Sequence, residues 1–236
     1  YRPERLNAPG KVRFDPDSGS LATDRETSDG MKYTVESALP RLTAADLTSV
    51  GGEVPPDIAA RYLELPGSVS RQVQREAQRV VGNERSPYKR AKALQDYFRD
   101  NFTYNIQVSP GHDADAMDQF LSSKQGYCEQ FAGTYAAMAR SLDLPARVAV
   151  GFTPGDFDQA AGVYRVKGIH AHAWPEVFIE GAVRGPPMQT PSAPRGTPCP
   201  ISAQPRLPRA GAALPERRLA QAARQGGLEN ARRMDP

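Results

Sequence analysis

Hydrophobic residues recur at helical spacing in four segments in the middle of the chain. The first segment, 69–81, carries small aliphatic side chains on one face. The second begins at Ser86-Pro87, an N-cap residue followed by proline at the first helical position, and a third covers 113–122. The fourth starts at Cys128, and its apolar side is formed by Phe131, Tyr135, Met138, Ala139 and Leu142. The pattern predicts four amphipathic helices.

Shorter apolar stretches follow the last of these helices and favour β-strands. Residues 146–153 are dense in valine, and 163–167 and 173–179 have similar character. Residues 155–159 are predicted to link the first two strands as a hairpin loop. A helix followed by antiparallel strands is typical of an α+β fold. We therefore predict that the helix bearing Cys128 packs on a small antiparallel β-sheet.

The pattern divides the chain into three parts. Residues 1–67 contain short strand-like runs separated by turn residues, which predicts a β-rich lead-in segment of strands and loops. Residues 68–181 carry the predicted helices and the strands that follow them, with a further short strand at 102–106, and form the predicted core. Residues 182–236 are rich in proline and arginine and contain no aromatic residue. We predict that this last part is a disordered tail.

The net positive charge of the chain comes from the tail. The whole chain carries a formal net charge of +3, with 30 basic and 27 acidic residues. The tail holds nine arginines against three acidic residues, so it contributes +6 and residues 1–181 contribute −3. The tail has no lysine and no interleaved aromatic residues, so the composition does not favour nucleic-acid binding.

The two cysteines of the chain differ in their surroundings. Cys128 opens a predicted helix, whereas Cys199 lies in the proline-rich tail, so we do not expect a disulfide between them. Neither Cys-x-x-Cys nor His-x-x-x-His spacing occurs, so no metal site is predicted. The sequence has no apolar run of 18 residues, and no membrane-spanning segment is expected in it.

Cys128 and two histidines are the candidates for chemistry. A thiol at a helix N-terminus is more readily ionised, because the helix dipole favours the thiolate. A neighbouring imidazole can take the thiol proton and so complete a nucleophilic pair. His170 and His172 lie on a predicted strand two positions apart, so we expect them on the same strand face. The sequence thus indicates a thiol–imidazole site.

Three motifs in this order resemble the transglutaminase-like superfamily, and in particular the bacterial membrane-anchored transglutaminase-like proteins. They are Gly-Tyr-Cys-Glu-Gln-Phe-Ala at 126–132, Leu-Pro-Ala-Arg at 144–147 and His-Ala-Trp-Pro-Glu-Val at 172–177. The resemblance implies a papain-like core in which Cys128 is the nucleophile and His172 the general base. Tyr127, His170 and Trp174 are possible supporting residues. Simple packing is the alternative for both Tyr127 and Trp174, and for Tyr127 it is the favoured one.

The sequence departs from the resemblance at the third member of the catalytic triad. The superfamily carries an aspartate about fifteen residues after the histidine. Here no acidic residue occurs between Glu180 and Glu216, so no third triad member is found. We hypothesise that the tail arises from an altered reading frame or a truncation of a longer ancestor. A family-like frame one base away in the encoding locus would support this, and the same tail in independent isolates would count against it.

The resemblance implies acyl transfer or hydrolysis of glutamine or peptide amides through a Cys128–His172 dyad, impaired by the missing aspartate. Three alternatives remain open: a papain-like cysteine protease, an inactive peptide-binding module of the same fold, and a truncated non-functional product. The expected partner is a protein or peptide substrate, and the chemistry requires no cofactor. The resemblance also implies a location on the extracytoplasmic face of the bacterial cytoplasmic membrane, with a tether that this sequence lacks.

Overall fold

The structure, a computed structural model, describes residues 2–15, 19–25, 27, 29–38, 43–49, 53–109 and 114–180. Near its start, β1 (Arg2–Asn7) pairs antiparallel with β4 (Thr34–Ala38), and β2 (Val12–Phe14) pairs antiparallel with β3 (Leu21–Thr23). These pairs agree with the short strand-like runs predicted in this part of the chain. β1 was not predicted, because five of its six residues are polar or proline and give no hydrophobic alternation.

Two short helices follow where the sequence predicted only strands and loops. They are α1 (Ala44–Ser49) and α2 (Pro56–Tyr62). A Pro-Pro pair such as Pro55-Pro56 is typical of a break between elements. In the structure Pro55 is the N-cap residue of α2, and Pro56 lies at its start, where a missing N–H costs no helical hydrogen bond. The prediction of strands and loops alone was therefore wrong for this part of the chain.

The next two helices confirm the hydrophobic pattern. α3 (Arg71–Val81) and α4 (Pro87–Asn101) each begin after a serine whose hydroxyl accepts a hydrogen bond from a backbone N–H of the first turn. The Ser70 hydroxyl accepts from Val73 N at 3.2 Å. The buried positions of the two helices are Val73, Ala77, Val81, Ala91, Leu94 and Phe98.

The helix that begins at Cys128, α6 (Cys128–Arg140), is the centre of the core. It is preceded by α5 (Ala114–Ser123) and by two-residue strands β5 (Thr103–Tyr104) and β6 (Gln125–Gly126), which pair in parallel. Ten of its 13 residues are buried, and α3, α4 and α5 pack around it. Aromatic rings fill the space between these helices and contact one another in stacked, tilted and edge-on pairs: Phe98, Phe102, Phe120 and Phe131.

An antiparallel pair of strands covers another side of α6. β7 (Ala146–Phe152) pairs with β10 (Ala171–Val177) over their full lengths, and both strands contact α6. This arrangement confirms the predicted α+β fold, with the helix that bears Cys128 packed on a small antiparallel sheet. The face of β10 toward α6 is formed by Ala171, Ala173, Pro175 and Val177.

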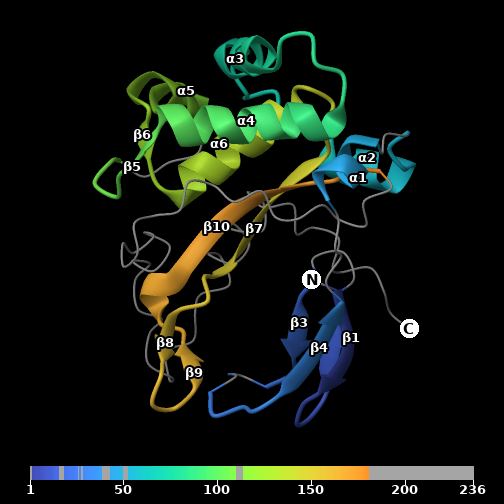
Figure 1. Cartoon of the computed structure of the whole chain (residues 1–236), viewed down its shortest axis with the longest axis vertical. Helices are drawn as coiled ribbons and strands as arrows, with labels where there is room; N and C mark the ends of the chain where they lie inside the picture. The colour runs from blue at the N-terminus through green and yellow to red at the C-terminus, as the bar shows by residue number, and fades with distance from the viewer. Residues whose placement is uncertain are drawn as a thin grey trace.

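The connection between β7 and β10 differs from the prediction. Residues 155–159 were expected to be only a loop, but they contain β8 (Asp156–Asp158), which pairs antiparallel with β9 (Val163–Arg165). These two strands form a hairpin of their own, so β7 pairs with β10 and not with the predicted second strand. Figure 1 shows the helices gathered at one end of the molecule and the β8–β9 hairpin at the far end of β7 and β10.

The predicted tail, 182–236, lies outside the described residues, and so does the position where the superfamily carries its aspartate. Within the described residues no helix has both the length and the apolar character needed to cross a membrane.

Candidate active site

Cys128 is the first residue of α6, and its side chain is fully buried. It packs in a small apolar cluster with Tyr127, Ala132 and Ala173. Ala173 comes from β10 and is the residue directly after His172. The structure thus places Cys128 against β10, the strand on which His172 lies.

Gln130, a residue that the sequence analysis did not single out, fixes the start of α6. Its side-chain oxygen accepts a hydrogen bond from Tyr127 N at 3.3 Å, and its amide nitrogen donates to Ser109 O at 3.2 Å. A glutamine three residues after the N-cap is the spacing of a capping box, so the sequence did contain this signal. The buried Gln130 side chain thus links the turn before Cys128 to Ser109, in the segment that follows β5.

Gly126 is required by close packing beside the same turn. A Cβ atom at this position would lie 2.6 Å from Gln130 Oε1 and 2.7 Å from the Phe120 ring. Contacts this short are not tolerated, so only glycine allows the chain to pass between these two side chains.

Cys128 is disulfide-bonded in the structure, contrary to the expectation from sequence. The other cysteine of the chain, Cys199, lies outside the described residues. The expectation rested on the composition of the tail, and composition alone does not determine whether a cysteine is oxidised. A sulfur held in a disulfide is not a nucleophile, so any thiol chemistry at Cys128 requires prior reduction.

His172 lies on β10 opposite Gly151 of β7. Its side chain is partly buried, and burial lowers the pKa of the imidazole below its ordinary value. Loss of hydration disfavours the charged form, so the imidazole is neutral near pH 7. A neutral imidazole is the form that can accept a proton from a thiol. Because side chains alternate along a strand, His172 is on the other face of β10 from Ala173.

Trp174 shares the strand face of His172, and the two rings are stacked with centroids 6.4 Å apart. The indole lies over Gly151, where a Cβ would be 3.0 Å from the ring. Trp174 therefore packs beside His172 and over Gly151, whereas other residues of β10 form the face toward α6. Its indole N–H is buried and has no hydrogen-bond partner among the described residues.

His170 is not on the strand. It ends a 3-10 turn, Gly168–His170, and its Nδ1 accepts a hydrogen bond from Lys167 N at 2.8 Å. Its Nε2 lies 3.7 Å from a carboxylate oxygen of Asp156 in β8. The prediction that His170 and His172 share a strand face is therefore wrong. The reason is that β10 begins one residue later, at Ala171, so the two-residue period does not extend back to His170.

The structure adds Tyr104 to the surroundings of Cys128. Tyr104 lies in β5 and packs against the cluster formed by Tyr127, Cys128, Ala132 and Ala173. The sequence placed Tyr104 on a short strand but gave no sign of this contact, because the parallel pairing of β5 with β6 joins segments that are distant in sequence. Tyr127, one of the predicted supporting residues, is buried in the same cluster.

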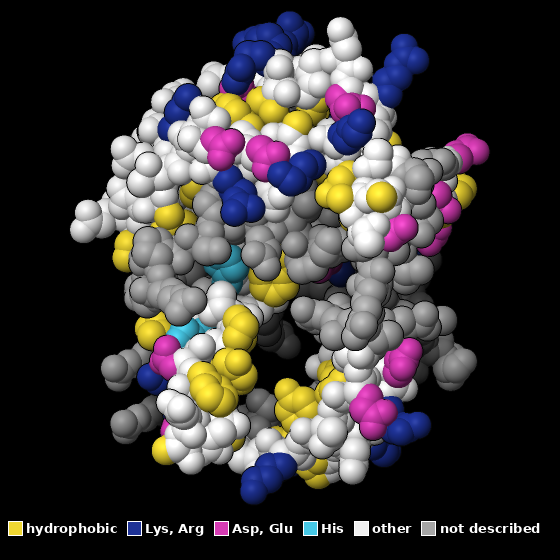
Figure 2. Space-filling view, viewed as in Figure 1, with side chains coloured by type: hydrophobic (Ala, Val, Ile, Leu, Met, Phe, Trp, Pro, Cys, Tyr) yellow, Lys and Arg dark blue, Asp and Glu magenta, His cyan; other side chains and the backbone are white. Residues whose placement is uncertain are grey.

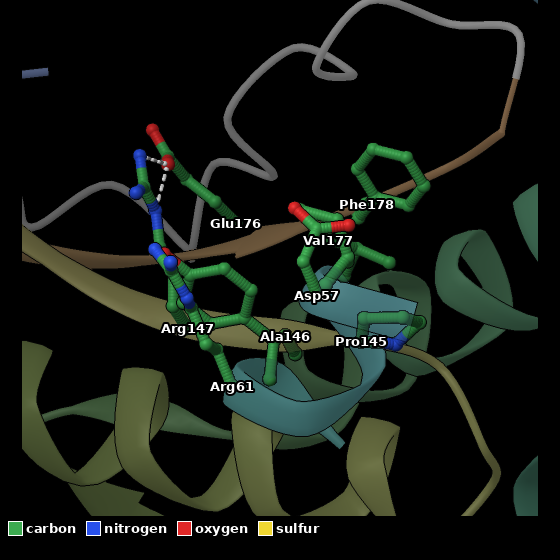
Figure 3. A pocket seen from close by; sticks show the side chains of 10 residues that line it. Asp57, Arg61, Pro145, Ala146, Arg147, Glu176, Val177 and Phe178 are labelled. Carbon is green, nitrogen blue, oxygen red and sulfur yellow. Dashed lines mark hydrogen bonds and ion pairs between the residues drawn. The ribbon is translucent and has the colours of Figure 1, made fainter. Parts of the chain in front are cut away.

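A separate pocket lies between α2 and the paired ends of β7 and β10 (Figure 3). Arg147 lines it and pairs with Glu176 through two contacts to the same carboxylate oxygen, 2.7 Å from Nε and 2.6 Å from a terminal guanidinium nitrogen. Neither Cys128 nor His172 lines this pocket. In the described residues, no three His, Cys, Asp or Glu side chains gather as they would around a metal ion.

Comparisons with known proteins agree with the motifs. The sequence model of the transglutaminase-like superfamily matches residues 74–183. The chain is 34% identical over 127 residues to the uncharacterized protein YebA of Bacillus subtilis. This match covers 50% of this chain and 17% of YebA. It is also 34% identical over 89 residues to a protein-glutamine gamma-glutamyltransferase of Pseudomonas aeruginosa, covering 37% of this chain and 13% of that protein.

Among solved structures, the periplasmic domain of TgpA from Pseudomonas aeruginosa superposes with a TM-score of 0.48 at 28% identity. The match covers 52% of this chain and 43% of the TgpA domain. The chain therefore spans less than a fifth of the two curated relatives and less than half of this solved domain. The match to residues 74–183 and the two curated relatives show that this segment of the chain is a transglutaminase-like domain.

Proposed function

We propose that Cys128, once reduced, is the nucleophile of a transglutaminase-like acyl transfer that acts on glutamine or peptide amides, with His172 as the general base. The observation that carries the proposal is the packing of Cys128, the first residue of α6, against β10, the strand that carries His172; the dyad requires the imidazole to turn from the opposite face of β10 toward the sulfur. The lowered pKa of His172 supports it, because the imidazole is then neutral and able to take the thiol proton.

The proposed reaction has two steps. In the first, the thiol proton of Cys128 passes to His172 while the sulfur attacks the carbonyl carbon of a carboxamide. The carbon–nitrogen bond then breaks, ammonia leaves with the proton from the imidazolium, and a thioester remains on Cys128. In the second step an amine or water attacks the thioester and restores the thiol. An amine acceptor gives an isopeptide bond, and water gives deamidation.

The disulfide at Cys128 sets a condition on this chemistry. Reduction to the thiol must come first, so we expect activity only in the presence of a reductant such as dithiothreitol. The sequence sets a second limit, because it holds no carboxylate between Glu180 and Glu216 to orient the imidazole. Loss of an orienting residue from a triad lowers turnover by about ten-thousand-fold, so we expect weak activity.

The test is a mass-spectrometric assay with a glutamine peptide and a primary amine, with and without reductant. Cys128→Ala and His172→Asn should both lower product to the background rate. His170→Asn is the matched control, because this histidine lies in the 3-10 turn and not on β10. The proposal is wrong if amine incorporation or deamidation survives in Cys128→Ala. A version carrying a family terminus with its aspartate should be faster by a large factor.

A peptide-binding module without activity is the second candidate, favoured by the disulfide at Cys128 and by the absence of the orienting carboxylate. The two candidates differ in the ionisation of the reduced thiol. An active site requires a Cys128 pKa well below the ordinary value of about 8.5, seen as rapid iodoacetamide labelling near neutral pH. A thiol that labels only above about pH 8 would favour the binding module.

We also propose an extracytoplasmic location. Disulfides persist in oxidising compartments and are rare in the cytosol, so the oxidised state of Cys128 supports it. One solved relative is named as a periplasmic domain, which agrees with this placement. Alkylation of intact cells with a membrane-impermeant thiol reagent, before and after reduction, is the measurement. Labelling of Cys128 only after cell lysis would rule out this location.

A further inference from the structure

β7 has one side along which no other strand is paired. Within the part of the chain that the structure describes, β7 pairs only with β10. The register of this antiparallel pair is continuous from Ala146 to Phe152. In such a pair the backbone N–H and C=O groups of successive residues point alternately toward the partner strand and away from it. Every second residue of β7 therefore directs its backbone groups away from β10.

Two backbone hydrogen bonds show which residues of β7 bond to β10. Thr153 N donates to His170 O at 2.9 Å, just beyond one end of the pair. Phe178 N donates to Pro145 O at 2.9 Å, just beyond the other end. Both bonds continue the register of the ladder and involve an odd-numbered residue on the β7 side. The odd-numbered residues of β7 thus bond to β10, and the even-numbered ones point outward.

Val148, Val150 and Phe152 are the outward-pointing residues in the exposed part of β7, and we call their backbone groups and side chains the β7 edge. Among the described residues, none of these backbone groups has a hydrogen-bond partner. The three side chains are exposed as well. The β7 edge thus combines available backbone donors and acceptors with apolar side chains at a spacing of two residues.

The β7 edge lacks the features that usually protect a strand from pairing with another chain. Such features are a proline, a charged side chain or a bulge. β10 has one of them, because Pro175 lies opposite Val148, and its missing N–H belongs to the side of β10 away from β7. From Val148 to Phe152 the sequence has no proline and no charge, and the register has no bulge. An edge of this kind can accept an added strand.

The β7 edge also adjoins the candidate active site. Val150 lies directly opposite Ala173 of β10, so the two side chains are on the same face of the sheet. Cβ atoms in such a pair are about 4.5–5.5 Å apart. Ala173 belongs to the apolar cluster that encloses Cys128. A chain segment bound along the β7 edge would therefore lie next to the surroundings of the sulfur.

We propose that the β7 edge binds the acyl-donor substrate as an added β-strand. The segment is extended and uncharged, carries apolar side chains at alternate positions, and holds the reactive glutamine. Its backbone bonds to Val148, Val150 and Phe152 supply affinity, and its alternate side chains pack on theirs. An uncharged segment matches the uncharged stretch of β7. That the segment is the substrate rests on the proposed function of Cys128.

The first test measures peptide binding without turnover. A fluorescent glutamine peptide with valine at alternate positions is titrated with the Cys128→Ala chain, and its polarisation is followed. Val150→Lys in this background places an ammonium under the bound segment and should weaken binding by about tenfold or more. The matched control is Val163→Lys, which adds the same charge to an exposed valine of β9 and should leave the affinity unchanged.

The second test concerns the backbone hydrogen bonds. Only every second N–H of an added strand faces β7. Peptides that are N-methylated at these positions should bind about fivefold to tenfold more weakly, because each methyl group removes one hydrogen bond. Methylation at the intervening positions should leave the affinity unchanged.

Several results would overturn the inference. It is wrong if Val150→Lys binds the peptide as tightly as its background, or if both sets of N-methylated peptides behave alike. A dimer in sedimentation that Val150→Lys dissociates would mean that the edge pairs with a second copy instead. Turnover that is unaffected by Val150→Lys in the reduced parent chain would refute the inference and leave the proposed function intact. Both binding patterns without any turnover would refute only the proposed function.

Discussion

The two sides of the candidate site are built in different ways. On the Cys128 side, the start of α6 is enclosed by buried aromatic rings, by the Gln130 side chain and by the β5–β6 pairing. On the His172 side, β7 leaves Val150 71% exposed and Phe152 60% exposed. Figure 2 shows further hydrophobic side chains on the surface toward the β8–β9 hairpin.

This difference indicates where the site gains its precision. Buried, close-packed residues tolerate little displacement, because interiors have few voids into which a side chain can move. Cys128 therefore lies in rigidly packed surroundings. His172, the proposed general base, lies on a strand pair that leaves apolar side chains such as Val150 and Phe152 exposed. We expect substitutions on the Cys128 side to change stability and chemistry together, and substitutions on the His172 side to change stability much less.

The largest expected contrast is between two phenylalanines. Phe131 is buried among the aromatic rings of the core, and Phe131→Ala should lower the free energy of unfolding by about 3–5 kcal/mol. Phe152→Ala removes a mostly exposed ring and should change it by no more than about 0.5 kcal/mol. Urea unfolding under reducing conditions measures both. Equal losses of unfolding free energy in the two variants would show that the Cys128 side and the His172 side do not differ in this way.

Two glycines give the second contrast. Gly126→Ala places a Cβ 2.6 Å from Gln130 Oε1 and 2.7 Å from the Phe120 ring, so the turn before Cys128 must shift. We expect a loss of about 1–3 kcal/mol, the usual cost of overpacking, together with slower alkylation of the reduced thiol. Gly168→Ala, near the start of β10, meets no atom within 4 Å and is the control. An unchanged alkylation rate in Gly126→Ala would show that the turn does not set the sulfur position.

The sequence predicted the parts of the fold whose signals are local. The helices α3, α4 and α6 have long apolar faces, and α3 and α4 also have capping residues, so their existence and starts were predictable. α1 and α2 have only six and seven residues, which is too few to show the helical spacing of apolar residues. The proline pair at the start of α2 is also typical of a loop. His170 was misplaced for a similar reason, because alternation does not reveal where a strand begins.

The site was predictable only in part. Motifs marked Cys128 and His172, because both lie in continuous stretches of characteristic residues. Tyr104 could not be found from sequence, because its contact with Cys128 arises from pairing between β5 and β6, which a pattern of single residues does not encode. The disulfide at Cys128 could not be found either, because sequence alone does not show which cysteines form disulfides.

The third contrast concerns ion pairs on the His172 side. Arg147 and Glu176 stand directly opposite each other on β7 and β10, with side chains 22% and 27% exposed. Glu176→Gln removes the carboxylate that pairs with the half-buried guanidinium of Arg147. We expect this change to lower the free energy of unfolding by about 1–2 kcal/mol. Lys167 and Asp156 form a pair exposed by 58% and 63%, so Asp156→Asn should cost about 0.5 kcal/mol or less. Thermal melts of both variants check this order, and a larger loss in Asp156→Asn would reverse it.

The smallest expected effect is the pH dependence contributed by His172. Burial lowers the pKa of His172 in the folded chain, while in the unfolded chain the imidazole titrates near its ordinary value of about 6.5. As the pH falls below about 6.5, the unfolded state therefore binds the proton first, and the folded state loses stability. His172→Gln should flatten this part of the stability curve between about pH 7 and pH 5. Melting temperatures of the reduced protein across this range are the measurement. A parent chain that becomes more stable on acidification, with His172→Gln removing the gain, would mean that His172 is charged in the fold and is held by a carboxylate rather than poised to accept a proton.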